Sequence, residues 1–106
     1  MNPAEKIRRL NDHARTQLTG SRLIITNGIK ALGNISEIIA AVQAFDEFTA
    51  DNDPYGEHDF GSIEMSGERI FWKFDYYDLS LTAASPDPAD RGVTQRVLTI
   101  MLAGEY

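Results

Sequence analysis

The strongest constraint on the fold lies in residues 58–77, where apolar and polar side chains alternate on both sides of Ser66-Gly67. Strict alternation is typical of strands with one buried face, and a Ser-Gly pair between two such runs indicates a turn. A two-residue turn there pairs Met65 with Glu68, Glu64 with Arg69 and Ile63 with Ile70. One face then carries Ile63, Met65, Ile70, Trp72, Phe74 and Tyr76, and the other carries Glu64, Arg69, Lys73 and Asp75. The segment predicts an antiparallel hairpin with one solvated face.

The first 32 residues predict a helix followed by extended chain. Asn2 precedes Pro3 as a cap precedes a first helical residue, and apolar residues recur at helical spacing up to Leu18, so we expect a helix that ends near Gly20. Residues 22–26 are rich in β-branched side chains, and Asn27-Gly28 is a strong turn signal before residues 29–32. A strand or a short hairpin fits this region.

Residues 35–48 predict a second helix. Asn34 followed by Glu37 resembles a capping box, and six apolar residues mark one helical face: Ile35, Ile38, Ile39, Val42, Phe45 and Phe48. The sequence 51–54, Asp-Asn-Asp-Pro, stops the helix because proline disfavours a helical residue before it.

The last third of the chain predicts a surface loop and one more strand. Residues 85–92 are too polar and too rich in proline for regular structure. Residues 96–103 are a continuous apolar run that suits a central strand or a buried helix, and its length and β-branched residues favour the strand. We therefore expect an α+β fold, with two helices packed on a small, mainly antiparallel sheet of about four strands.

Length and composition indicate one domain over residues 1–106, since each half of a chain of this size is too small for its own core. The absence of cysteine excludes disulfides, thiolate metal sites and cysteine nucleophiles. No signal peptide and no apolar run long enough to span a bilayer is found, so we expect a cytoplasmic protein without membrane contact.

Charge is distributed unevenly along the chain. Residues 1–22 carry five basic and two acidic side chains, a net charge of +3, whereas the remainder carries five basic and fourteen acidic ones, a net charge of −9. Such a surface disfavours phosphate backbones and attracts cationic partners. Aromatic residues around Trp72 are flanked by Asp75 and Asp78, so nucleic acid is not the expected partner.

Four segments of the chain resemble one bacterial family: Asp53-Pro-Tyr-Gly-Glu-His-Asp-Phe-Gly61, Phe71-Trp-Lys-Phe-Asp-Tyr-Tyr-Asp78, Ser85-Pro-Asp-Pro-Ala-Asp90 and Arg96-Val-Leu-Thr-Ile-Met-Leu-Ala-Gly-Glu-Tyr106. The resemblance is to the domain of unknown function family numbered 3768, and it is weakest in the first helix. It implies a small bacterial protein that stands alone and is encoded on chromosomes and mobile elements. It implies no catalytic residues.

A metal site in residues 51–59 is the one enzymatic reading that the residues offer. Asp51, Asp53 and Asp59 match three positions of a calcium-binding loop, but the bidentate glutamate at its twelfth position is missing. With Glu57 and His58, these residues form the alternative hypothesis of a small metal-assisted enzyme. No cofactor motif is present, and we expect neither a cofactor nor a resident metal.

The leading hypothesis is a non-catalytic accessory or regulatory protein that binds another protein with a basic surface. We expect the 53–61 and 85–92 loops to meet at one end of the sheet and to form an acidic rim. Its candidate residues are Asp53, Glu57, His58, Asp59, Asp78, Asp87 and Asp90. Imitation of nucleic acid by the acidic surface is a third hypothesis, and a homo-oligomer is left open.

Overall fold

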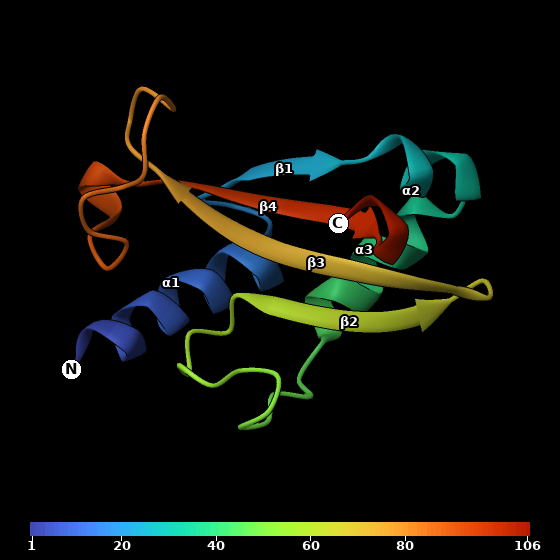
Figure 1. Cartoon of the computed structure of the whole chain (residues 1–106), viewed down its shortest axis with the longest axis horizontal. Coiled ribbons are helices and arrows are strands. Elements are labelled where there is room, and N and C mark those ends of the chain that lie inside the picture. The colour runs from blue at the N-terminus through green and yellow to red at the C-terminus, as the bar shows by residue number, and fades with distance from the viewer.

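A computed structural model describes all 106 residues and shows an α+β fold (Figure 1). In chain order, the elements are α1 (Pro3–Gln17), β1 (Arg22–Ile25), α2 (Asn27–Leu32), α3 (Ile35–Ala44), β2 (Phe60–Met65), β3 (Glu68–Tyr77), the 3-10 turn η1 (Arg91–Val93), β4 (Gln95–Leu102) and the 3-10 turn η2 (Ala103–Glu105). The strands form one sheet in the order β1-β4-β3-β2, with β1 parallel to β4 and the other pairs antiparallel. The expected fold class is confirmed. No helix is both long and apolar enough to cross a membrane.

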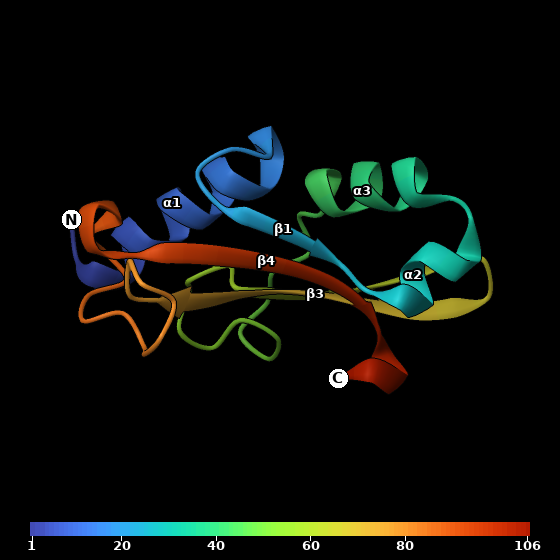
Figure 2. The same cartoon turned by 90° about the horizontal axis from the view of Figure 1, so that it is seen from above.

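The helices lie on one side of the sheet and the C-terminal turn lies on the other (Figure 2). The core between helices and sheet is centred on Trp72, which is fully buried, with Ile38 and Val42 of α3 packed against the strands. Ala14 brings α1 into the same core. The helices cover one face of the sheet, and β3 keeps the polar side chains of Lys73 and Asp75 on the other face, as alternation predicted.

The hairpin has the register that the sequence predicted. Ile63 pairs with Ile70, Glu64 with Arg69 and Met65 with Glu68, around a turn in which Ser66 and Gly67 both have positive φ. Gly61 lies opposite Trp72, and a Cβ at that position would overlap the Trp72 ring. Glycine is therefore required here for the tryptophan to lie flat on the strand.

The apolar run near the C-terminus is a strand, as favoured, and its position explains its composition. β4 lies between β1 and β3, so both of its edges are paired. Leu98 and Ile100 belong to the core under the helices, while Val97 and Met101 on the other face are also buried. A strand buried on both faces has no need of alternation.

Of the two possibilities left open for residues 22–32, the structure confirms the strand and excludes the short hairpin. Residues 27–32 form the short helix α2, and Asn27-Gly28 is its first turn. The side chain of Thr26 makes no capping bond, and Glu105 supplies the acceptor instead: its carboxylate accepts from the Gly28 N–H at 3.1 Å and from the Thr26 hydroxyl at 2.7 Å. This contact joins residues 77 positions apart. Local turn signals do not reveal it.

One correction concerns the end of α3, which stops at Ala44 and does not continue to Phe48. Arg15 of α1 takes the carbonyl groups that the next turn would use, donating through Nη1 to the carbonyls of Val42, Gln43 and Phe45 at 2.8, 3.1 and 2.9 Å. Phe45 and Phe48 leave the helix but still reach the core, where both rings pack edge-on against Trp72.

Candidate functional site

The two loops of the expected rim lie at the same end of the sheet and are linked by buried polar groups. Asn11, fully buried on α1, donates through Nδ2 to the Glu57 carbonyl at 3.1 Å and to the Tyr76 hydroxyl at 2.7 Å. Its Oδ1 accepts from Arg96 Nε at 2.9 Å, and Arg96 Nη2 donates to the carbonyl of Pro88. This series of hydrogen bonds, from Glu57 through Asn11 and Arg96 to Pro88, joins the 53–61 loop to the 85–92 loop.

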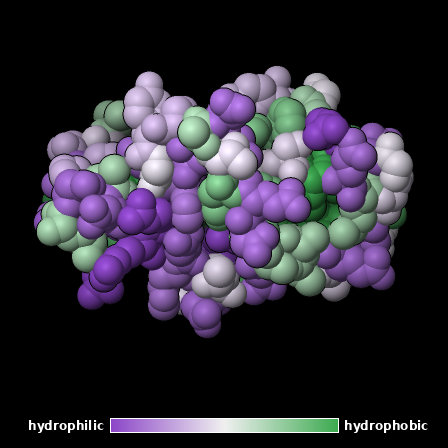
Figure 3. Space-filling model, turned by 90° about the horizontal axis from the view of Figure 1, so that it is seen from below, coloured by the Kyte–Doolittle hydropathy of each residue, from purple (hydrophilic) through white to green (hydrophobic).

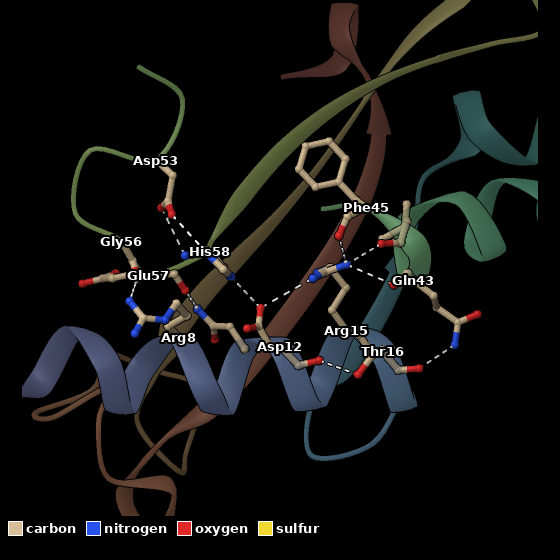
Figure 4. Close-up of polar contacts among 12 residues, drawn as sticks. Arg8, Asp12, Arg15, Thr16, Gln43, Phe45, Asp53, Gly56, Glu57 and His58 are labelled. Atoms are coloured by element: carbon tan, nitrogen blue, oxygen red, sulfur yellow. Dashed lines mark hydrogen bonds and ion pairs between the residues drawn. The ribbon is translucent and has the colours of Figure 1, made fainter. Parts of the chain in front are cut away.

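His58 is the centre of the contacts between α1 and the 53–61 loop (Figure 4). Its Nδ1 lies 2.8 Å from Asp12 Oδ1, and its Nε2 lies 3.5 Å from Asp53 Oδ2. The ring stacks on Phe48 with 3.6 Å between centroids and 4° between planes, and the backbone has a φ of 53°. The Asp53 carboxylate also accepts from the His58 N–H at 3.1 Å. His58 therefore fastens a strained loop to the first helix.

The sequence grouped His58 with Asp51, Asp53, Glu57 and Asp59, of which Asp53 contacts it, but it did not indicate Asp12. The signal was present in the helix itself, since Arg8, Asp12 and Arg15 recur at spacings of four and three and so share one side of α1. That side faces the 45–58 segment, where Arg8 Nη1 donates to the Gly56 carbonyl at 3.1 Å. Which loop would lie against that side could not be read from spacing.

The remaining rim residues do not gather around one opening. Asp78 accepts from the Thr82 N–H at 3.0 Å, and the hydrogen bonds from Thr82 and Ser80 lower the pKa of the Asp78 carboxyl. Asp87 and Asp90 accept from backbone N–H groups two residues further on and shape the 85–92 loop. They line a hollow together with Lys6, Arg9 and Arg91, on the opposite flank of α1 from His58. Helix α1 thus separates the two halves of the expected rim.

Glu57 and Asp59 are two acidic residues of the expected rim whose carboxyl groups are partly buried. Burial raises the pKa of Glu57, and the neighbouring Asp59 carboxylate raises it further. Burial likewise raises the pKa of Asp59, with the charges of Asp53 and Asp75 adding to the effect. Two half-buried carboxyl groups with mutual repulsion are a local excess of negative charge.

The residues proposed for a metal do not form a cluster. Asp51 is exposed, Asp53 is nine-tenths buried and bonded to His58, and no group of three or more His, Cys, Asp or Glu side chains lies in a metal-binding arrangement. The geometry offers the metal-assisted hypothesis no support beyond the residue types themselves.

The structure adds an acidic side that the rim hypothesis did not include. Between Lys30 and Arg69, the chain has nine carboxylates and no lysine or arginine. This stretch forms α3, the 45–59 segment and β2, which lie next to one another (Figure 1). Six of the carboxylates are exposed: Glu37, Asp46, Glu47, Asp51, Glu64 and Glu68. We call this surface the acidic side.

A groove of about 430 Å³ crosses the acidic side between the end of α3 and strand β2. Its apolar part includes Ala41, Ala44, Phe45 and Ile63, and its charged part includes Asp46, Glu47, Glu64 and Arg69. Figure 3 looks at this side and shows hydrophilic residues over its centre and left, with an apolar patch toward the end that holds the β2–β3 turn.

A larger hollow of about 900 Å³ lies on the helix-free face of the sheet, over Val97, Thr99 and Met101. Its charged groups are already paired within the chain or balanced in sign: Lys73 bonds Asp75 at 2.6 Å, and Glu105 is held by Thr26. Hydrogen bonds from Thr26 and from backbone N–H groups lower the pKa of Glu105. The hollow has no net charge with which to select a charged partner.

No curated protein and no solved structure matches this chain. A family model does match it, over residues 25–105. The match excludes α1 and all of β1 but Ile25, and it includes every later element. The four segments that suggested the resemblance lie within the matched part, except for the last residue, Tyr106. The chain belongs to the family described as protein of unknown function (DUF3768).

Proposed function

We propose that this chain is a non-catalytic accessory or regulatory protein, and that it binds a basic segment of another protein along the acidic side. The observation that carries the proposal is the position of an unpaired sheet edge within a stretch of nine carboxylates that has no lysine or arginine. An edge supplies backbone hydrogen bonds for an added strand, and surrounding charge selects what is added.

β2 is the edge strand in question, because it pairs only with β3. The Phe74 N–H donates to the Asp59 carbonyl at 2.9 Å, so the hydrogen-bonded positions on this side of the hairpin are the odd-numbered ones. The backbone groups of Ser62 and Glu64 therefore point away from β3 and are free to pair with an incoming strand.

Side chains beside this edge favour a strand with alternating apolar and basic residues. Ile63 and Phe45 offer apolar contact on the inner side of β2, while Glu64 and Glu47 offer negative charge close by. Glu64 is paired with Arg69, but both side chains are more than half exposed, so the pair is weak and exchangeable. Long-range attraction from the other carboxylates accelerates the encounter and weakens as salt is added.

The proposal is tested by in-cell crosslinking in a bacterium that encodes the chain, with a crosslinker placed at Ser62 and the captured protein identified by mass spectrometry. Capture should be lost in a Glu47→Lys/Glu64→Lys variant, which reverses charge beside the edge. Asp87→Lys/Asp90→Lys makes the same change in charge on the other side of α1, and it should leave capture intact. Loss in the second variant alone would move the binding surface to the 85–92 loop and contradict the assignment to β2.

A further inference from the structure

Arg96 is a buried cation without an anion. Only 3% of the residue is exposed, and no carboxylate lies within ion-pair distance of its guanidinium. Its Nε donates to Asn11 and its Nη2 to the Pro88 carbonyl, which are both neutral acceptors, and the group lies over the Tyr76 ring at 5.2 Å. The other buried arginine, Arg15, has the Asp12 carboxylate at 3.5 Å. Burying an unpaired charge is costly, so the exception needs a reason.

The third guanidinium nitrogen of Arg96, Nη1, makes no hydrogen bond within the chain, yet it is not sealed from solvent. Arg96 lines a pocket of about 420 Å³ on the flank of α1 that faces away from the acidic side. The pocket is lined by Leu10, His13, Thr19, Gly20, Arg91, Gly92, Thr94 and Arg96. It contains two arginines and a histidine but no carboxylate, in a chain whose net charge is −6.

Other donors at this pocket are also unused. His13 and Arg91 are exposed and make no ion pair in the chain. Thr19 and Gly20 follow the end of α1, and their N–H groups have no backbone acceptor. Asp12, the one acidic residue of α1 beyond its first turn, lies on the opposite flank beside His58. Asp87 and Asp90 line the neighbouring hollow, which shares Leu10 and Arg91 with this pocket, but they do not line the pocket itself.

We propose that this pocket binds the phosphoryl group of a phosphorylated small molecule. Two guanidinium groups balance a dianion, whereas a single carboxylate would leave one of them unpaired. Leu10 is the one apolar residue of the lining, so the recognised part is the charged group and not an apolar body. A nucleic-acid backbone also presents phosphates, but nine carboxylates elsewhere on a small domain repel a long polyanion.

The test is a titration of ¹⁵N-labelled protein, followed by NMR at constant ionic strength, with inorganic phosphate and with glycerol phosphate. Saturable shifts should appear at the Gly20 and Gly92 amides and at Arg96 Nε–H. Acetate and a short DNA duplex serve as the competing ligand classes. Equal saturation by acetate, equal shifts with chloride alone, or saturation by the duplex without saturation by phosphate would each overturn the assignment.

Variants separate this site from general electrostatics. Arg91→Gln and His13→Gln alter exposed residues, so the fold is retained, and each should weaken phosphate binding about five- to tenfold. Arg22 lies on β1, outside the pocket lining. Arg22→Gln removes one positive charge, as Arg91→Gln does, and should leave the affinity for phosphate unchanged. Equal weakening by Arg22→Gln would show that net charge and not this pocket attracts the anion.

Discussion

Replacing Arg15 with methionine should destabilise the protein by about 3 kcal/mol. The Val42 carbonyl is buried and would keep only the bond from the Phe45 N–H at 3.3 Å, and loss of a hydrogen bond from a charged donor costs about 1.5–3 kcal/mol. The Gln43 and Phe45 carbonyls are partly buried and can regain water, so each adds about 0.5–1 kcal/mol. Methionine keeps apolar contact where the guanidinium now lies 5.0 Å from the Trp72 ring centroid, which holds the total near the lower end of the range.

Urea unfolding monitored by the fluorescence of Trp72, the single tryptophan, measures this loss directly. The matched control is Arg8→Met, on the same flank of α1, where one hydrogen bond to a partly buried carbonyl is lost and less than about 1 kcal/mol is expected. If both variants lost the same small amount, Arg15 would not be the group that ends α3 and joins it to α1.

Three further predictions concern the stability of the fold at other positions. Gly61→Ala should cost about 1–3 kcal/mol, because its methyl group overlaps Trp72, and thermal melts should show it. Glu57→Gln/Asp59→Asn should raise the melting temperature at neutral pH. Since both carboxyl groups have raised pKa values, the wild type gains stability as pH falls through them, and the variant's advantage should vanish near pH ~4. Glu105→Gln should be destabilising at neutral pH, with a difference from wild type that disappears on acidification, because the pKa of Glu105 is lowered in the folded state. A pH-independent difference in either case would contradict the assigned cause.

The pattern of apolar and polar residues along the sequence was sufficient to predict most of the sheet. Alternation on both sides of Ser66-Gly67 determined the hairpin register because a slip of one residue would have put Trp72 and Ile70 in solvent. The strand at residues 95–102 was identified by β-branching and length, and its burial on both faces explains why alternation is absent there.

Contacts between distant residues account for the errors. Asn27-Gly28 begins a helix, where the Glu105 carboxylate accepts from the Gly28 N–H and the Thr26 hydroxyl. Helix α3 ends early, where the Arg15 guanidinium donates to the carbonyls of its last turn. The site shows the same limit. Spacing placed Asp12 and Arg15 on one side of the first helix, but only packing shows that His58 lies against it and that α1 divides the expected rim.

Hydrogen exchange of β2 tests the central proposal most directly. In the free chain, the amides of Ser62 and Glu64 point away from β3, so they should exchange quickly. When the protein captured by crosslinking is bound, strand addition should slow exchange at both amides. The amide of Leu23, on the opposite edge strand β1, should remain fast. Unchanged exchange at Ser62 and Glu64 in a saturated complex would contradict binding at this edge.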